Sequence, residues 1–185
     1  SLYIVVSPED LKRAKPLIRL LITQMTHRLT ENMEFCDGNT IKNYKHRLLM
    51  MLDEFAALGR IDVFQSALSY LPGYGIKSVL VAQDFSQIYS AYSRDESITS
   101  NCRVRIAFAP NKFETAKVLS DMCGVATTKR QVRTYTGHRF SPLLSHIMAA
   151  EQETQRPLLT PDEVMRLGHD DALIFVAGSP VIKAQ

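Results

Sequence analysis

The chain has 185 residues, of which 45% are hydrophobic and 22% are charged. This is the composition of a globular protein with enough apolar material to bury a core. The net charge of +3 is too small to indicate nucleic-acid or membrane binding by itself, so function has to be sought in motifs.

Short apolar runs alternate along the chain with helical patterns. Strands are predicted at Leu2–Val6, Leu48–Leu52, Ser78–Ala82, Val104–Phe108 and Leu173–Val176. Helices are predicted at Ser7–Met33 with a break at Pro16, and at Asp62–Leu71, Phe85–Tyr92, Lys112–Met122 and around Thr160–Glu163. The alternation favours an α/β fold with a mostly parallel sheet flanked by helices.

Two further segments of the chain have distinct patterns. An apolar stripe between Leu17 and Met33 predicts that the first helix faces the core. Residues 126–157 are polar and basic, and we expect a hairpin or an added lobe there. Apolar runs fall short of the ~18 residues that span a bilayer, so we expect this part of the chain to be soluble and to make no membrane contact. Cys36, Cys102 and Cys123 form no metal-binding pattern, which favours a reducing compartment.

Two adjacent acids, Asp53 and Glu54, follow the apolar run Leu48–Leu52 directly. Ligands of parallel α/β sheets bind beyond the carboxyl ends of the strands, where these acids would lie. An apolar strand followed by Asp-Glu is the Walker B pattern, in which the Asp holds Mg²⁺ and the next acid orients or deprotonates the attacking water. The alternative is a chance run whose acids cap the next helix.

Gln83 ends the next predicted strand and strengthens the catalytic interpretation, although a lone strand-end glutamine is more often solvated. The phosphate-binding motif G-x-x-x-x-G-K-[ST] is missing from the sequence. The nearest match, Gly73–Ser78, has the wrong spacing and precedes a strand. The chain by itself therefore has the metal-holding half of an ATP site, and we expect it not to hydrolyse ATP.

Several segments together resemble the TraG-type coupling proteins of bacterial conjugation and type IV secretion. The resemblance covers nearly the whole chain and is much more specific than the two acids alone. It rests on SLYIVVSPEDLKRAKPLIRLLITQ, LLMMLDEFAALGRI, LPGYGIKSVLVAQDFSQIY, SITSNCRVRIAFAPN and ALIFVAGSPVIKA.

The resemblance implies a partial RecA-like P-loop ATPase fold, with residues 1–185 as the C-terminal portion of the motor domain. The Walker A part, an all-α insertion and a membrane anchor would lie upstream. The whole protein would be a homo-hexamer on the cytoplasmic face of the inner membrane, using ATP and Mg²⁺. Its partners would be DNA, the relaxosome and secretion-channel proteins.

The family's site residues carry over to three positions of this sequence. Asp53 would hold Mg²⁺ through water, Glu54 would activate the attacking water, and Gln83 would contact the γ-phosphate. Some relatives carry an arginine finger in the turn that is 72–75 here, but this sequence has none there. Arg94 is our candidate for a finger acting across the subunit interface.

The segment 126–157 contains a basic stretch, in which Lys129, Arg130 and Arg133 closely precede Tyr135 in the sequence. Basic residues interleaved with an aromatic could contact a DNA backbone. A solvated hairpin or a docking site for a partner protein are the alternatives. A second hypothesis for the whole chain is a stand-alone substrate- or relaxosome-binding module without ATPase activity.

Overall fold

The computed structural model describes residues 1–31, 34–36, 39–41, 46–136 and 146–185. Residues Ser1–Val104 and Arg105–Gln185 each form a compact unit, and each is described by itself. None of the helices within these ranges is both long and apolar enough to cross a bilayer.

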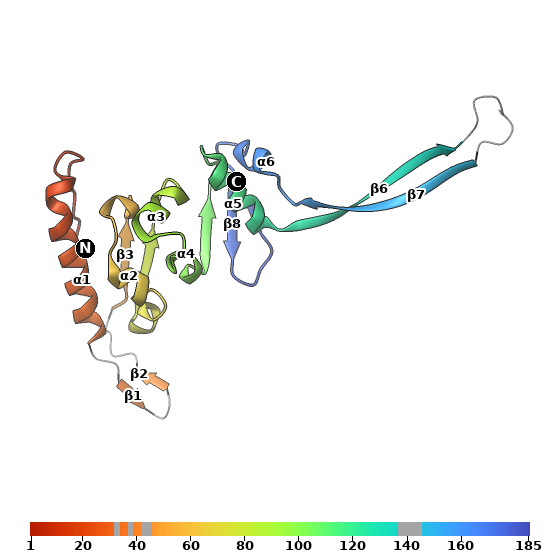
Figure 1. The fold of residues 1–185 in the computed structure, drawn as a ribbon. Helices are drawn as coiled ribbons and strands as arrows, with labels where there is room; N and C mark the ends of the chain where they lie inside the picture. Colours follow the sequence, from red (N-terminus) through yellow and green to blue (C-terminus); the bar gives the residue numbers. More distant parts are fainter. Residues whose placement is uncertain (32–33, 37–38, 42–45, 137–145) are drawn as a thin grey trace. The chain divides into compact units, whose positions relative to one another are not determined.

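A pair of parallel strands, β3 (Leu48–Leu52) and β4 (Ile76–Leu80), lies at the centre of the first unit (Figure 1). The register runs from Leu48 opposite Ile76 to Leu52 opposite Leu80. Parallel strands need a crossover, which here contains η1 (Phe55–Leu58), α2 (Asp62–Ala67) and η2 (Leu71–Tyr74). Beyond β4 follow α3 (Phe85–Tyr92) and α4 (Ile98–Asn101).

One face of the β3–β4 pair is packed and the other is open. The packed face contributes Met50 to a core whose buried members come from α1 (Leu11–Thr30), η1, α2, α3 and α4. These members are Ile22, Met50, Phe55, Leu58, Ile61, Phe64, Tyr92 and Ile98. The opposite face exposes Leu49, Met51, Val79 and Val81. The prediction of a buried strand therefore holds for alternate residues only, as expected for a sheet covered on one side.

The predicted strand at Leu2–Val6 is wrong. In the structure these residues have no strand pairing within the described ranges, and Leu2, Tyr3, Ile4 and Val5 are exposed. The segment runs back along α1 as an extended trace (Figure 1). An apolar, β-branched run becomes a strand only when a neighbour accepts its backbone hydrogen bonds, and sequence pattern alone does not supply that neighbour.

The first helix differs from its prediction in two ways. It continues through Pro16 without a break, because one missing backbone bond in its second turn is outweighed by a 20-residue helix packed on the core. Its core-facing side also differs: Leu11, Ile18 and Ile22 pack inward, whereas Leu17 and Leu20 are 66% and 56% exposed. The predicted core-facing stripe at Leu17–Met33 is therefore only partly right: Leu21 and Met25 are half-buried, and Met33 lies outside the described residues. The helix carries apolar residues on both faces, so the period alone does not say which is buried.

The second unit contains a three-stranded sheet in the order β5 (Val104–Ala107), β8 (Ala172–Val176), β9 (Ile182–Ala184). Helix α5 (Phe113–Cys123) contributes buried Ala116 and Leu119, and α6 (Pro161–Met165) contributes buried Val164. Thr160 precedes α6 as the N-cap of a capping box. The Glu163 N–H donates to the Thr160 hydroxyl, and the Thr160 N–H donates to the Glu163 carboxylate.

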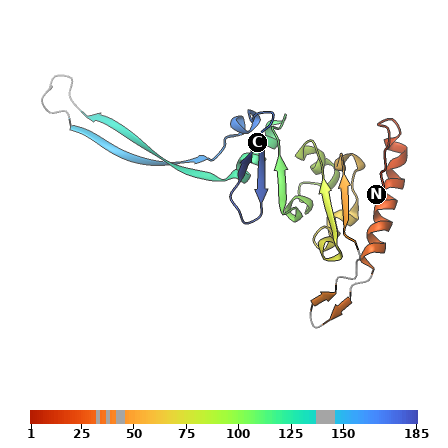
Figure 2. The same ribbon diagram turned by 180° about the vertical axis from the view of Figure 1, so that it is seen from behind.

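A long antiparallel ribbon of β6 (Val125–Thr136) and β7 (His146–Pro157) also belongs to this unit (Figure 2). This confirms the hairpin alternative for 126–157 within the described residues; 137–145 lie outside them. The expected mostly parallel sheet is not what the structure shows. The sheets are small: β3–β4 is parallel, whereas β6–β7, β8–β9 and the short pair β1 (Glu34–Cys36) with β2 (Asn39–Ile41) are antiparallel. Hairpin connections, which need no crossover, account for the antiparallel pairs.

Candidate functional site

Asp53 and Glu54 occupy the turn between β3 and η1, and the backbone at Glu54 is left-handed. Its φ is 47° and its ψ is 45°, a conformation uncommon for residues other than glycine. The Glu54 N–H donates to Asp53 Oδ1 at 3.1 Å, and the Glu54 carbonyl accepts from the Ala57 N–H at 2.8 Å. Such strained backbone persists only where its surroundings fix it, and it clusters at functional sites.

Gln83 and Glu54 meet at the carboxyl ends of the two parallel strands. The Gln83 Nε2 group donates a hydrogen bond to Glu54 Oε1. Backbone bonds extend past the ends of β3 and β4 and hold the two tips together. Val81 N–H donates to Leu52 O at 3.0 Å, and Phe55 N–H donates to Val81 O at 2.9 Å. The structure thus brings together Asp53, Glu54 and Gln83, the residues that the sequence singled out at successive strand tips.

The residue after Glu54 anchors the turn in the core. The Phe55 side chain is 1% exposed. Its ring stacks on Tyr92 at a centroid distance of 5.3 Å and meets Phe64 edge-on at 5.5 Å. Because aromatic contacts of this kind are both large and directional, they fix where the chain leaves Glu54.

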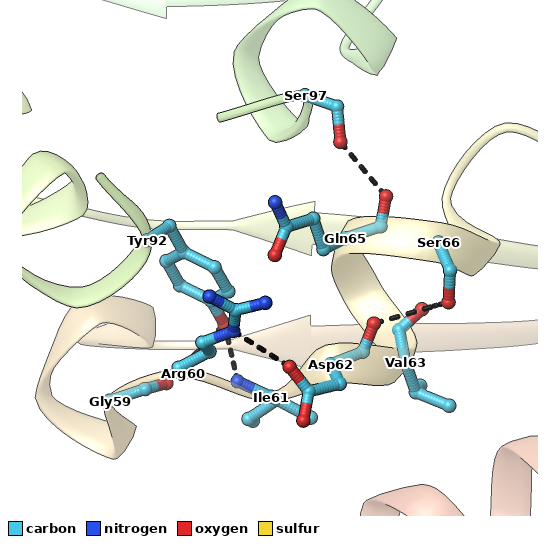
Figure 3. Close-up of polar contacts among 9 residues, drawn as sticks. All are labelled: Gly59, Arg60, Ile61, Asp62, Val63, Gln65, Ser66, Tyr92 and Ser97. Atoms are coloured by element: carbon cyan, nitrogen blue, oxygen red, sulfur yellow. Dashed lines mark hydrogen bonds and ion pairs between the residues drawn. The ribbon is translucent and has the colours of Figure 1, made fainter. Parts of the chain in front are cut away.

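Tyr92 also secures the far end of the loop through its hydroxyl group (Figure 3). The oxygen accepts from the buried Ile61 N–H at 3.0 Å, and the hydroxyl donates to Gly59 O at 3.3 Å. Burial raises the pKa of Tyr92 above its ordinary value, so the hydroxyl stays protonated and able to donate. Nearby, Arg60 and Asp62 form an ion pair at 2.7 Å. Loop 54–61 is therefore attached to the core at both ends.

Helix α1 contacts the same loop from the side. The Arg19 Nε group donates to Leu58 O at 2.7 Å, at the end of η1. Gly59 has a φ of +69°, and a Cβ at this position would lie 2.2 Å from Arg19 Nη2. The backbone conformation at this position therefore favours glycine, and a Cβ would also displace the end of the Arg19 side chain.

A cleft of about 480 Å³ opens beside Glu54. Its walls come from α1, η1 and α3, and Glu54 is the acid among them. The lining residues are Lys15, Glu54, Ala56, Ala57, Gly59, Ser86, Gln87, Ser90 and Ala91. The sequence reading missed Lys15 and the α3 residues. The spacing of Ser86 and Ser90, and of Gln87 and Ala91, is the i, i+4 signal that could have located this helix face.

The residues able to hold a metal ion in the candidate site are few. No cluster of three or more His, Cys, Asp or Glu side chains occurs among the residues that the structure describes. Asp53 is exposed at the strand tip, and one of its oxygens accepts the Glu54 N–H bond. Magnesium commonly binds proteins through one or two carboxylates, several waters and substrate phosphates, so this sparse donor set fits Mg²⁺ held largely by other ligands.

Arg94 is not brought to this site. It is exposed in the turn between α3 and α4 and does not line the cleft. The Lys129, Arg130 and Arg133 positions lie on β6, in the second unit, where they pair in register with Glu153, Gln152 and Ala149. Residues two apart in a strand share a face, so positions 129 and 133 share one face and position 130 lies on the other. The backbone therefore does not gather the three basic positions on a single face, and position 129 is opposite an acid.

The fold and the sequence together define a class of protein. The chain belongs to the family described as type IV secretory system conjugative DNA transfer, which matches residues 1–185. It is 43% identical to the conjugal transfer protein TraG of Escherichia coli over 98% of its length, and 28% identical to the protein VirD4 of Agrobacterium fabrum over 98%. The chain spans 31% of that TraG and 26% of that VirD4.

Solved structures of the plasmid coupling protein TrwB share the fold. The unbound monoclinic form of TrwBdeltaN70 has a TM-score of 0.70 and 20% identity, covering 95% of this chain and 38% of that one. TrwB in complex with ADP and Mg²⁺ has a TM-score of 0.63 and 18% identity, covering 94% and 37%. The family expected from the sequence is thereby confirmed.

Proposed function

We propose that this chain is the C-terminal portion of the RecA-like motor domain of a coupling ATPase, which moves DNA and protein substrates from the relaxosome to the secretion channel. The observation that carries the proposal is the meeting of Glu54 and Gln83 at the tips of parallel strands, with Asp53 next to them. The family, and the nucleotide complexes of TrwB, support ATP and Mg²⁺ as the cofactors.

Each of the three side chains has a role in the proposed site. Asp53 would hold a hydrated Mg²⁺ ion through a carboxylate oxygen, and the bound ion would supply charge neutralisation to the phosphates. Glu54 would accept a proton from the attacking water, and its backbone is held in a left-handed conformation in the turn after β3. Gln83 donates a hydrogen bond to Glu54 and would contact the γ-phosphate. The phosphate-binding loop would come from the remainder of the protein.

The proposed assembly is a homo-hexamer at the cytoplasmic face of the bacterial inner membrane, with its ATP sites between subunits. Arg94, exposed after α3, remains our candidate for the basic residue contributed by a neighbouring subunit. Lys129, Arg130 and Arg133 remain candidates for contact with DNA. Their distribution over both faces of the ribbon suits a backbone contact less well than a single basic face would.

A test of this function is metal removal from the complete protein that carries this chain. ATP hydrolysis, measured by phosphate release with DNA present, is expected to fall at least ~10-fold when a chelator takes up Mg²⁺, because the ion would supply charge neutralisation to the phosphates. Excess Mg²⁺ should restore the rate, which controls for damage by the chelator. No hydrolysis under any condition, together with capture of relaxosome proteins by this chain, would instead favour the nucleotide-independent binding module.

A further inference from the structure

The hydrogen bond between Gln83 and Glu54 joins two residues that are 29 positions apart in the sequence. The backbones that carry them are held by the Val81 bonds to Leu52 and Phe55, so the pairing follows from the sheet. The bond uses only one oxygen of the carboxylate, Oε1. A carboxylate has two acceptor oxygens, so this bond leaves Oε2 available to accept a proton or a further hydrogen bond.

A catalytic carboxylate works well only when its orientation is fixed. The left-handed backbone at Glu54 and the buried Phe55 ring fix where the side chain begins. The terminal torsions of a glutamate remain broad unless a hydrogen bond restrains them. In this turn, Gln83 Nε2 is the donor placed to restrain them. Misplacement of a reacting group by about 1 Å can lower a rate by about 10²-fold, so the restraint has a measurable consequence.

We infer that Gln83 is a positioning residue for Glu54, fixing the orientation of the carboxylate that receives the proton from water. The inference rests on the proposed ATPase function, and it adds a role to the γ-phosphate contact that the family resemblance implies. A glutamine amide carries two N–H donors, so one bond to Glu54 leaves the amide able to meet a phosphate as well. Gln83 therefore acts on catalysis through Glu54.

The inference is tested with a double-mutant cycle in the complete protein, using Gln83→Leu, Glu54→Gln and the double variant. We expect Gln83→Leu alone to slow single-turnover ATP hydrolysis by about 10-fold or more. In the Glu54→Gln background the same substitution should change the rate by less than about 2-fold, because the group it positions is already gone. An equal loss in both backgrounds, or no loss in either, would overturn the inference.

A binding measurement separates positioning from other roles and stays informative if the Glu54→Gln rate is too low to follow. Gln83→Leu should leave the affinity for ADP, which has no γ-phosphate, within about 2-fold of the parent protein, and any loss of affinity for a non-hydrolysable ATP analogue measures the γ-phosphate contact separately. A loss of analogue affinity as large as the loss of single-turnover rate would mean that Gln83 acts on the γ-phosphate alone. The matched control is Gln24→Leu on an exposed position of α1, which should change neither rate nor affinity. If Glu54→Gln itself turns over normally, Glu54 is not the catalytic base and this inference fails with it; only the absence of hydrolysis by the parent protein would refute the proposed ATPase function.

Discussion

Replacing Glu54 by glutamine in the complete protein is expected to lower ATP turnover by roughly 10²–10⁴-fold, the contribution typical of a positioned general base. The amide has nearly the shape of the carboxylate, so it preserves the turn, but it does not accept the proton from water. Nucleotide affinity should change little, because Glu54 acts on the attacking water and not on the bound phosphates. Steady-state hydrolysis and equilibrium binding of a non-hydrolysable analogue measure the two effects separately.

The same Glu→Gln change at an exposed site provides the control. Glu31, at the end of α1, forms an ion pair with Arg28 at 2.7 Å, and both side chains are largely exposed. Exposed ion pairs of this kind contribute about 0–1 kcal/mol, so Glu31→Gln should leave both turnover and binding unchanged. Turnover in Glu54→Gln equal to that of the Glu31→Gln control would remove Glu54 from the catalytic site.

Phe55→Ala is expected to destabilise the first unit by about 3–5 kcal/mol, the usual cost of removing a buried aromatic side chain. The ring is almost fully buried, and its loss leaves a cavity facing both Tyr92 and Phe64. Because the ring also anchors the turn that carries Glu54, the substitution should reduce catalysis in the complete protein as well. Urea unfolding of the chain followed by far-UV circular dichroism measures the stability loss.

Leu17→Ala is the matched control for that measurement. Leu17 lies on the exposed side of α1 in the same unit, and alanine is a better helix former than leucine. Its free energy of unfolding should stay within about 0.5 kcal/mol of the parent chain. A Phe55→Ala loss no larger than that of Leu17→Ala would mean that the aromatic cluster is not the core of this unit.

Local apolar and helical patterns were sufficient to locate several of the helices and strands. The strands at Leu48–Leu52 and Leu173–Val176 and the helices near Phe85–Tyr92 and Lys112–Met122 lie within a few residues of their predicted bounds, whereas β9 was not predicted. The strand at Leu2–Val6 failed because strand formation depends on a partner that no local pattern specifies. The buried side of α1 was only partly predicted for a related reason: both of its faces are apolar, and only tertiary contacts choose between them.

The part of the site that could be predicted from the sequence is the part formed by residues at the ends of strands. Asp53, Glu54 and Gln83 converge because parallel strands in register place their carboxyl ends at one edge. The left-handed backbone at Glu54 and the Tyr92 hydroxyl bonds to loop 59–61 depend on contacts between distant residues, and composition carries no signal for them. Lys15 was missed because no sequence motif indicates that α1 packs beside the turn that carries Glu54.

The most direct test of the account is a structure of the complete protein with Mg²⁺ and a non-hydrolysable ATP analogue. A metal–water bond of about 2.1 Å followed by a hydrogen bond of about 2.7 Å would place an Asp53 oxygen roughly 4 Å from the ion. The account predicts that distance, with Glu54 and Gln83 facing the γ-phosphate. Nucleotide bound with Asp53 more than about 8 Å from the metal, beyond the reach of one bridging water, would contradict it.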